Sequence, residues 1–319
     1  MTQRLASDAA GIERAAAILR EGGLVAFPTE TVYGLGADAT SAGAIAGIYA
    51  AKERPRFNPL IAHVASLEAA EAQGRFDGDA RRLAQAFWPG PLTLVLPVAQ
   101  NGTVSDLARA GLDTVGLRVP NHVVAFELLR QVGRPVAAPS ANRSGWVSAT
   151  DPEHVIGDLD GRIDAVVDGG STSVGLESTI VACLGGMPRL LRPGGVPREA
   201  IEGVVGRTLG PDESAAVLAP GMLASHYAPR ARVRMNAEVV KPGEAALLFG
   251  GARPPGIEHA GASLDLSESG DLTEAAARLF SYLRRLDAAG VGTIAVTSIP
   301  ESGLGDAIND RLRRASAER

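Results

Sequence analysis

The chain has a single cysteine, Cys183, in 319 residues, so it cannot form an internal disulfide, and nothing in it indicates an oxidising compartment. Aromatic residues make up only 4% of the chain, so its core must consist mainly of Ala, Val, Leu and Ile. No segment approaches the roughly 18 consecutive apolar residues of a membrane span. The N-terminal segment, "MTQRLASDAAGIERAAAILREGG", is typical of an amphipathic helix and not of a secretory signal. We therefore expect a cytoplasmic protein with no membrane association.

A surplus of positive charge is also missing. The net charge is −5, which argues against a protein that binds nucleic acid constitutively, although a local basic pocket is still allowed. The sequence has no HExxH or CxxC motif and no carboxylate cluster, so we expect no metal site built by the protein. A content of 45% hydrophobic and 21% charged residues is typical of a soluble globular protein, and the length favours two domains.

The order of helical and strand-like segments predicts an α/β fold. Over residues 8–202 the helices are interspersed among strands without a strict repeat, which favours a mixed sheet. Residues 203–231 are rich in Gly and Pro and are expected to form a linker. Residues 232–319 alternate strand, helix and strand, which predicts a smaller domain with a parallel, Rossmann-like sheet, although no GxGxxG motif supports dinucleotide binding. The clearest helices are expected at residues 9–21, 41–51, 78–87, 273–289 and 305–317.

The segment "KERPRFNPL" at residues 52–60 concentrates basic side chains between two prolines. Of the 31 basic residues in the chain, only Lys52 and Lys241 are lysines, so a lysine in this segment is exceptional. The prolines favour an extended backbone, in which alternate residues point to one side. If the whole segment is extended, one face carries Lys52, Arg54, Arg56 and Asn58. Such a face suits a polyphosphate. A solvated charged loop paired with Glu53 explains the same pattern.

Further motifs accompany this segment in a fixed order along the chain. They are "PTETVYGLG" upstream, then "WPGPLTLVLP" at 88–97, "GLRVP" at 116–120, "APSANRSG" at 138–145, "GLEST" at 175–179, "LLRPG" at 190–194, "SHYAP" at 225–229 and "GLGDAINDRLRRA" at 303–315. Each is a weak signal alone, but the ordered set is specific. Over about residues 8–200 the set resembles the YrdC-like domain of the threonylcarbamoyl-AMP synthase family, and the last two motifs extend the resemblance to its long, two-domain form.

The resemblance implies an enzyme that converts L-threonine, bicarbonate and ATP into threonylcarbamoyl-AMP and pyrophosphate. It implies a twisted mixed sheet with a basic concave cavity, a small Rossmann-like domain, and a linker that can lie over the cavity. The product feeds the threonylcarbamoyladenosine modification of tRNA through downstream transfer machinery. Mg²⁺ is expected to arrive with ATP, held mainly by phosphates. The chemistry needs cations and positioning and no protein nucleophile, which agrees with the lack of a Ser-His-Asp or Cys-His signature.

The resemblance also implies roles for individual residues. Lys52 and Arg54 match the KxR motif of the family and are expected to be catalytic, at the phosphates. The expected ATP contacts are Lys52, Arg54, Asn58, Thr114, Ser140, Asn142, Ser148, Arg192, His226 and Tyr227. The expected threonine contacts are Thr31, His63, Arg118, Ala138 and Ser178.

Several of these residues also have ordinary structural explanations. Arg118 lies in the strand "VGLRVP", where a buried guanidinium needs a partner, either a substrate carboxylate or an internal Asp or Glu. His63 alternates with apolar neighbours and fits a structural strand histidine. Ser140 and Asn142 fit a common polar turn. His226 and Tyr227 fit a packing role in the linker.

Two other functions remain compatible with the sequence. The basic concavity could hold RNA backbone, although the acidic net charge and the scarcity of aromatic residues disfavour this. A related domain also forms carbamoyl-adenylate in hydrogenase-cofactor maturation. That function would bring zinc-finger-like cysteines and an acylphosphatase-like region, neither of which the sequence contains.

Overall fold

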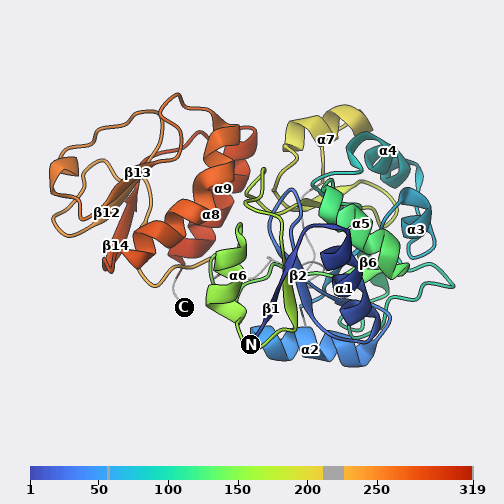
Figure 1. Cartoon of the computed structure of the whole chain (residues 1–319). Coiled ribbons are helices and arrows are strands. Elements are labelled where there is room, and N and C mark those ends of the chain that lie inside the picture. Colours follow the sequence, from blue (N-terminus) through green and yellow to red (C-terminus); the bar gives the residue numbers. More distant parts are fainter. Residues whose placement is uncertain (56–57, 211–225, 318–319) are drawn as a thin grey trace.

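The computed structural model describes residues 1–55, 58–210 and 226–317, which form a larger N-terminal domain and a smaller C-terminal one (Figure 1). Strands of the larger domain are β1 (Gln3–Ala6), β2 (Val25–Phe27), β3 (Gly34–Asp38), β4 (Ile61–His63), β5 (Leu92–Pro97), β6 (Thr114–Arg118), β7 (Val136–Ala137), β8 (Ala165–Asp168), β9 (Thr179–Ala182) and β10 (Arg189–Arg192). Its helices are α1 (Ala9–Arg20), α2 (Ala42–Lys52), α3 (Leu67–Glu71), α4 (Gly78–Phe87), α5 (Val123–Val132), α6 (Pro152–Leu159) and α7 (Arg198–Val205).

The large sheet is mixed, as predicted. Within the described ranges its ten strands lie in the order β1-β8-β2-β3-β7-β4-β6-β5-β9-β10. β1 and β8 are parallel, as are β4 and β6, whereas β2 and β3 are antiparallel. Apolar side chains of α1 and α5 form one core with the sheet, and those of α2, α4, α6 and α7 form another. The helices therefore cover both faces of the sheet (Figure 1).

The smaller domain is built on a parallel sheet. Its elements are β11 (Arg232–Arg234), β12 (Ala245–Leu248), the 3₁₀ helix η1 (Ile257–His259), β13 (Ser263–Asp265), α8 (Leu272–Ala288), β14 (Thr293–Val296) and α9 (Leu304–Ser316). The strand order is β11-β14-β12-β13, and each neighbouring pair is parallel. Together with α8 and α9, this confirms the Rossmann-like expectation.

The five clearest predicted helices are all present within a residue or so of the expected bounds. The prediction of a helix throughout the N-terminal segment is wrong at residues 3–6, which form β1. These residues pair with Ala165–Asp168, and a strand partner so far along the chain leaves no local pattern. The short elements α3, α6, α7 and β11 were also not predicted. No helix in the described ranges combines the length and apolarity needed to cross a membrane.

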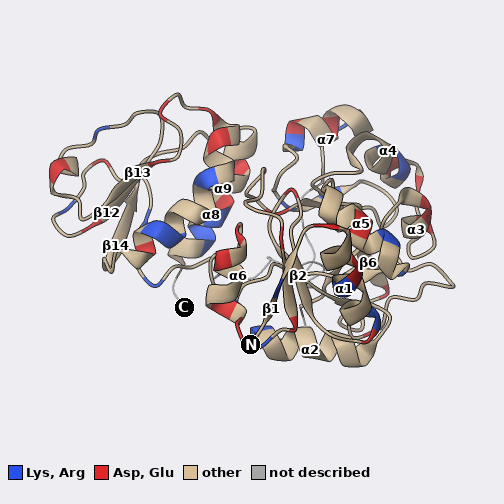
Figure 2. Cartoon of the chain, viewed as in Figure 1, with Lys and Arg blue, Asp and Glu red and all other residues tan. Residues whose placement is uncertain are grey.

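The two domains meet through α8 and α9 (Figure 1). An apolar cluster spans the junction, joining Val32, Val147 and Leu176 of the larger domain to Phe280 and Leu283 of α8. Figure 2 shows basic residues on α8 and α9 and acidic residues on α6. Across this boundary Arg284 Nη2 lies 2.7 Å from Asp158 Oδ2.

Backbone meets backbone at one point of the junction. Gly175 has φ +74°, and a Cβ atom there would lie 2.5 Å from both the carbonyl oxygen of Ala276 and the Cα atom of Ala277 in α8. Only glycine accepts both the positive φ and this approach. The loop that carries "GLEST" therefore packs directly against the smaller domain.

Candidate active site

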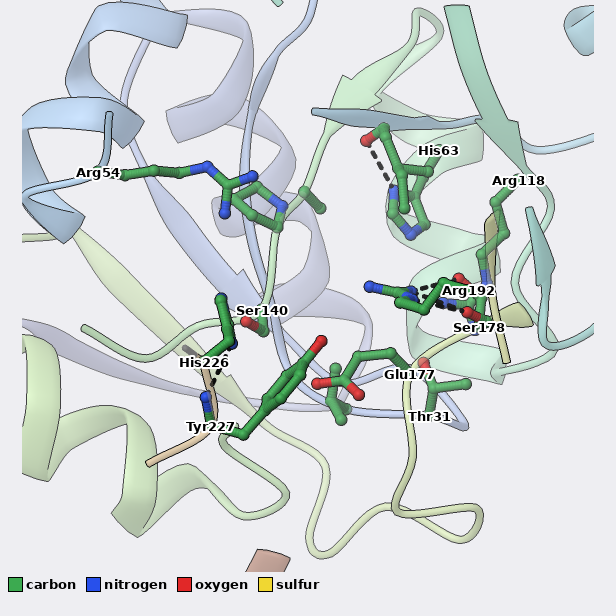
Figure 3. A pocket seen from close by; sticks show the side chains of 14 residues that line it. Thr31, Arg54, His63, Arg118, Ser140, Glu177, Ser178, Arg192, His226 and Tyr227 are labelled. Atoms are coloured by element: carbon green, nitrogen blue, oxygen red, sulfur yellow. Dashed lines mark hydrogen bonds between the residues drawn. The ribbon is translucent and has the colours of Figure 1, made fainter. Parts of the chain in front are cut away.

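A polar cavity of about 40 Å³ lies where strand ends of the large sheet, the segment after residue 225 and the "GLEST" loop meet (Figure 3). Its lining residues are Thr31, Val32, Arg54, Ile61, His63, Arg118, Ala138, Pro139, Ser140, Glu177, Ser178, Arg192, His226 and Tyr227. A space of this size holds about three water molecules.

The fold explains why distant motifs meet here. β4 and β6 are parallel neighbours in which His63 lies opposite Arg118, so the "PLIAHV" and "GLRVP" motifs end side by side. β7 lies beside β4, and its chain continues directly into Ala138 and Ser140. β9 begins just after Ser178. The order of motifs along the chain thus becomes a ring of side chains around one cavity.

Ten of the fifteen predicted site residues line this cavity. They are Thr31, Arg54, His63, Arg118, Ala138, Ser140, Ser178, Arg192, His226 and Tyr227. Five others lie outside the lining set, and these are Lys52, Asn58, Thr114, Asn142 and Ser148. Sequence reasoning did not assign Glu177, although it stands inside the quoted "GLEST" motif. A carboxylate between Leu176 and Ser178 was the available signal.

The expectation that Lys52 and Arg54 share one face of an extended segment is wrong. Lys52 is the last residue of α2, and Glu53 ends the helix in the left-handed conformation, with φ 55°. The alternation therefore does not begin at Lys52, while Arg56 lies outside the described residues. Helical hydrogen bonding through Lys52 outweighs the local preference set by the prolines.

Lys52 is buried and contacts backbone, not the cavity. Its Nζ donates to the carbonyl oxygen of Ser140 at 2.6 Å and to that of Asn142. Burial, together with the nearby Arg54 cation, lowers the pKa of Lys52 well below its usual value. In this arrangement Lys52 holds the loop that carries Ser140.

Arg54 points its guanidinium into the cavity (Figure 3). It is 7% exposed, and its Nη2 donates to the carbonyl oxygen of Pro59 at 3.3 Å. Its Nε has no hydrogen-bond acceptor among the described residues. Burial lowers the pKa of Arg54 to about 10, so the group is still a cation at neutral pH. A buried cation with an unused donor is suited to bind an anion.

Arg118 has the internal carboxylate partner that the sequence left open. Its Nη2 lies 2.7 Å from Glu30 Oε1, and both side chains are buried. The two groups are an ion pair without hydrogen-bond alignment, because neither Nη2 nor either Glu30 oxygen has a hydrogen-bond partner in the described part of the chain. Arg118 Nε donates to the carbonyl oxygen of Gly90 at 3.3 Å. A second carboxylate with better alignment could therefore still bind Arg118.

The neighbouring loops fix the remaining polar residues. Asn142 Nδ2 donates to the carbonyl oxygens of Arg143 at 2.7 Å and Trp146 at 2.9 Å, as in an ordinary polar turn. Arg192 Nη2 donates to the carbonyl oxygen of Ser178 at 2.8 Å, and Ser178 Oγ lies 2.7 Å from Thr93 Oγ1. These contacts hold Ser178 against the cavity from two sides.

Asn58, Thr114 and Ser148 lie beyond this first ring. Asn58 is buried, and its Oδ1 has no hydrogen-bond partner within the described ranges. Thr114 begins β6 and is partly exposed. Ser148 is buried, and its Oγ donates to the Glu177 carboxylate. Ser148 thus reaches the cavity only through Glu177.

His226 and Tyr227 form one wall of the cavity. Their ring centroids are 4.1 Å apart, and the Tyr227 backbone N–H donates to His226 Nδ1 at 2.9 Å. The His226 backbone N–H donates to the carbonyl oxygen of Arg314 in α9 at 3.2 Å. Burial, reinforced by the nearby cations of Arg54 and Lys52, lowers the pKa of His226 well below its usual value. His226 is therefore a neutral ring at the cavity.

His63 is also neutral. Burial, followed by the Arg118 cation, lowers its pKa from 6.5 to about 3. Its Nδ1 lies 3.3 Å from the carbonyl oxygen of Ile61. A ring with this pKa does not titrate near neutral pH, so His63 does not act as a proton carrier in that range.

The depressed pKa of His63 predicts a pH dependence of stability. Between pH 3 and 6.5 the unfolded chain binds the proton that the folded chain excludes, so the free energy of unfolding falls as the pH drops below 6.5. From pH 7 to pH 5 the wild type should lose about 2 kcal/mol more than His63→Gln. Urea unfolding at both pH values measures this difference. The exposed His259→Gln is the control, and equal losses in the wild type and His63→Gln would refute the prediction.

Comparisons with known proteins agree over both domains. Residues 17–194 match the model of the Sua5, YciO and YrdC proteins, described as "Telomere recombination", and residues 196–317 match "Threonylcarbamoyl-AMP synthase, C-terminal domain". The threonylcarbamoyl-AMP synthase of Bacillus subtilis is 41% identical over 100% of this chain and 96% of its own length. That of Pyrococcus abyssi is 44% identical over 97% of this chain and 94% of its own length. The crystal structure of P. abyssi Sua5 complexed with L-threonine has a TM-score of 0.89 at 39% identity, covering 99% of this chain and 97% of that one.

Proposed function

We propose that in this chain, which belongs to the threonylcarbamoyl-AMP synthase family, the cavity beneath His226 and Tyr227 is the place where ATP meets L-threonine. The activity is the synthesis of threonylcarbamoyl-AMP, with L-threonine, bicarbonate and ATP as substrates and pyrophosphate as the second product. The observation that carries the proposal is the set of buried cations, Arg54, Arg118 and Arg192, that converge on one small polar space. The RNA-binding alternative is not favoured.

The two substrates are assigned to different sides of the cavity. Arg118 binds the threonine carboxylate, with Thr31, His63, Ser178 and the backbone of Ala138 around the rest of the amino acid. Arg54 and Arg192 bind ATP phosphates, together with Ser140, His226 and Tyr227. The other assigned ATP residues, Lys52, Asn58, Thr114, Asn142 and Ser148, act from positions around the cavity. Lys52 does so by holding the Ser140 loop.

The chemistry then needs little beyond charge and position. The threonine amine attacks bicarbonate with loss of water, or carbon dioxide with loss of a proton, and forms a carbamate. An oxygen of the carbamate then attacks the α-phosphorus of ATP, and pyrophosphate leaves. Arg54 and Arg192 stabilise the negative charge that develops on the phosphates. The neutral His226 and the Tyr227 ring exclude water from the labile carbamate and the mixed anhydride. Mg²⁺ arrives with the ATP phosphates. In the described ranges no group of three or more His, Cys, Asp or Glu side chains could hold a metal ion.

Three further assignments complete the proposal. Residues 8–202 carry the reaction, residues 203–231 link and cover the site, and residues 232–319 form the small domain. Of the linker, residues 211–225 lie outside the described part of the chain. The intermediate passes to tRNA threonylcarbamoyl-transfer machinery in the cytoplasm, with no stable nucleic-acid complex of this chain.

The test is an incubation of the full chain with ATP, Mg²⁺, bicarbonate and single amino acids, with pyrophosphate and adenylate products measured. We expect pyrophosphate release that requires both threonine and bicarbonate. The control omits bicarbonate and removes dissolved carbon dioxide. Equal release with serine, valine and threonine, or none with threonine, would contradict the proposed function.

A further inference from the structure

Arg311 belongs to α9 of the small domain, yet its side chain is buried against the larger one. The residue is 0% exposed, and its Nε donates to Glu177 Oε2 at 2.8 Å. Its Nη2 donates to the carbonyl oxygen of Pro193 at 3.0 Å, and its Nη1 to Asp310 Oδ2 at 2.5 Å. The reaction proposed above assigns no role to Arg311, although its guanidinium is buried and crosses the domain junction.

The same guanidinium supports Tyr227. Its carbon lies 5.0 Å from the centre of the Tyr227 ring, within the range of a cation–π contact. Phe280 of α8 stacks on the same ring, at 5.7 Å between centroids and 23° between planes. Tyr227 has φ 62°, a conformation that a bulky residue adopts only where its surroundings enforce it. Arg311 and Phe280 are part of those surroundings, and both come from the small domain.

Glu177 is the second cavity residue that Arg311 holds. Its carboxylate is buried and accepts hydrogen bonds from Arg311 and from Ser148 Oγ. Arg192 of β10 is a further cation near Glu177, and Asp310 of α9 pairs with Arg311 itself. A buried carboxylate that loses its cation is strongly destabilised. Next to ATP phosphates it would also repel the nucleotide.

We propose that Arg311 is a positioning residue for adenylation, through which the small domain holds Tyr227 and neutralises Glu177 at the nucleotide side of the cavity. This inference rests on the proposed function of the cavity. The small domain thereby supplies a part of the site without touching substrate. Ser178 does not depend on Arg311, because Thr93 and Arg192 hold it. Tyr227, which is assigned to ATP, contacts Arg311 directly, so we expect the loss of Arg311 to affect ATP more than threonine.

The first test is Arg311→Met in the full chain, with pyrophosphate release measured against ATP and against threonine. We expect kcat/KM for ATP to fall about 100-fold and the KM for threonine to change less than about threefold. Arg311→Lys keeps the positive charge but not the planar guanidinium, and its kcat/KM for ATP should be about tenfold higher than that of Arg311→Met. Unchanged ATP kinetics in Arg311→Met, or equal changes for the two substrates, would overturn the proposal.

Two matched arginines serve as controls. Arg313 lies on the same helix with its side chain 49% exposed, and Arg313→Met should leave the kinetics unchanged. Arg284→Met removes a second ion pair that crosses the junction, Arg284 with Asp158. This variant should lower stability without raising the KM for ATP. A rise equal to that of Arg311→Met would mean that domain docking alone explains the effect, which also overturns the proposal.

A double variant distinguishes the two roles of Arg311, which are neutralising the Glu177 carboxylate and holding the Tyr227 ring. Glu177→Gln should improve turnover about tenfold in the Arg311→Met background, because it removes the unpaired carboxylate, but should not improve it in the wild type. The double variant buries no unpaired carboxylate, so it provides the test even where Arg311→Met does not fold. The KM of the double variant for ATP should stay above the wild-type value, because Tyr227 still lacks its contact with the Arg311 cation. A wild-type KM for ATP would show that Arg311 does not support Tyr227. Threonine-independent kinetics in the wild type would instead reject the proposed function itself.

Discussion

Arg54→Ala is expected to reduce threonine-dependent adenylate formation by about 10²- to 10³-fold, the usual effect of removing one donor that stabilises developing charge. The guanidinium is buried, points into the cavity and has an unused Nε donor, so little in the folded chain depends on it. Its one hydrogen bond in the described part of the chain is to the carbonyl oxygen of Pro59. The folded state should therefore persist, and relieving a buried cation offsets the lost contact.

Rapid-quench or steady-state assays of pyrophosphate release measure this loss, and circular dichroism confirms the fold. Arg81→Ala, on the outer face of α4 with its side chain 54% exposed, is the matched control and should retain full activity. A turnover of Arg54→Ala within threefold of the control would remove Arg54 from the mechanism.

Arg118→Leu is expected to affect both binding and stability. Without the guanidinium the threonine carboxylate loses a buried charged partner, which costs about 3 kcal/mol or more, equivalent to a 100-fold or larger rise in the KM for threonine. The same change leaves the Glu30 carboxylate buried without a cation, which destabilises the folded state by about 3–5 kcal/mol.

The two effects separate in Arg118→Leu/Glu30→Gln. This double variant removes the unpaired carboxylate, so it should recover most of the unfolding free energy in urea titrations but none of the affinity for threonine. Glu30→Gln alone is the control for Glu30. Recovery of threonine turnover in the double variant would show that Arg118 acts only through Glu30.

Sequence patterns predicted the mixed sheet and the small parallel sheet, because both leave local signals, whereas most of the cavity lining was expected from the family resemblance that the ordered motifs carry. The strand "PLIAHV" brings His63 to its end, and "GLRVP" does the same for Arg118. The alternation of residues in these strands is sufficient to say that the side chains are buried. The pairing of their ends follows only from the sheet order.

The errors have physical causes of a different kind. Lys52 was expected on an extended face, but α2 continues through it and its ammonium finds two backbone carbonyl oxygens from residues far along the chain. The role of Glu177 has no local signal, because its partner, Arg311, lies 134 residues later in the chain. No periodic pattern in the sequence marks an ion pair between residues so far apart. The contact can therefore be recognised only in a structure that places the two domains together.

Gly175 limits how the junction between the domains can vary. Because the backbone of its loop touches the backbone of α8, no side chain can be introduced at this position without displacing a helix or the loop. Two residues further on, the same loop carries Glu177, and then Ser178. A side chain introduced at position 175 should therefore disturb the packing of α8 as well as the placement of Glu177 and Ser178 at the cavity. A single glycine thus links the packing of the small domain to the position of two cavity residues.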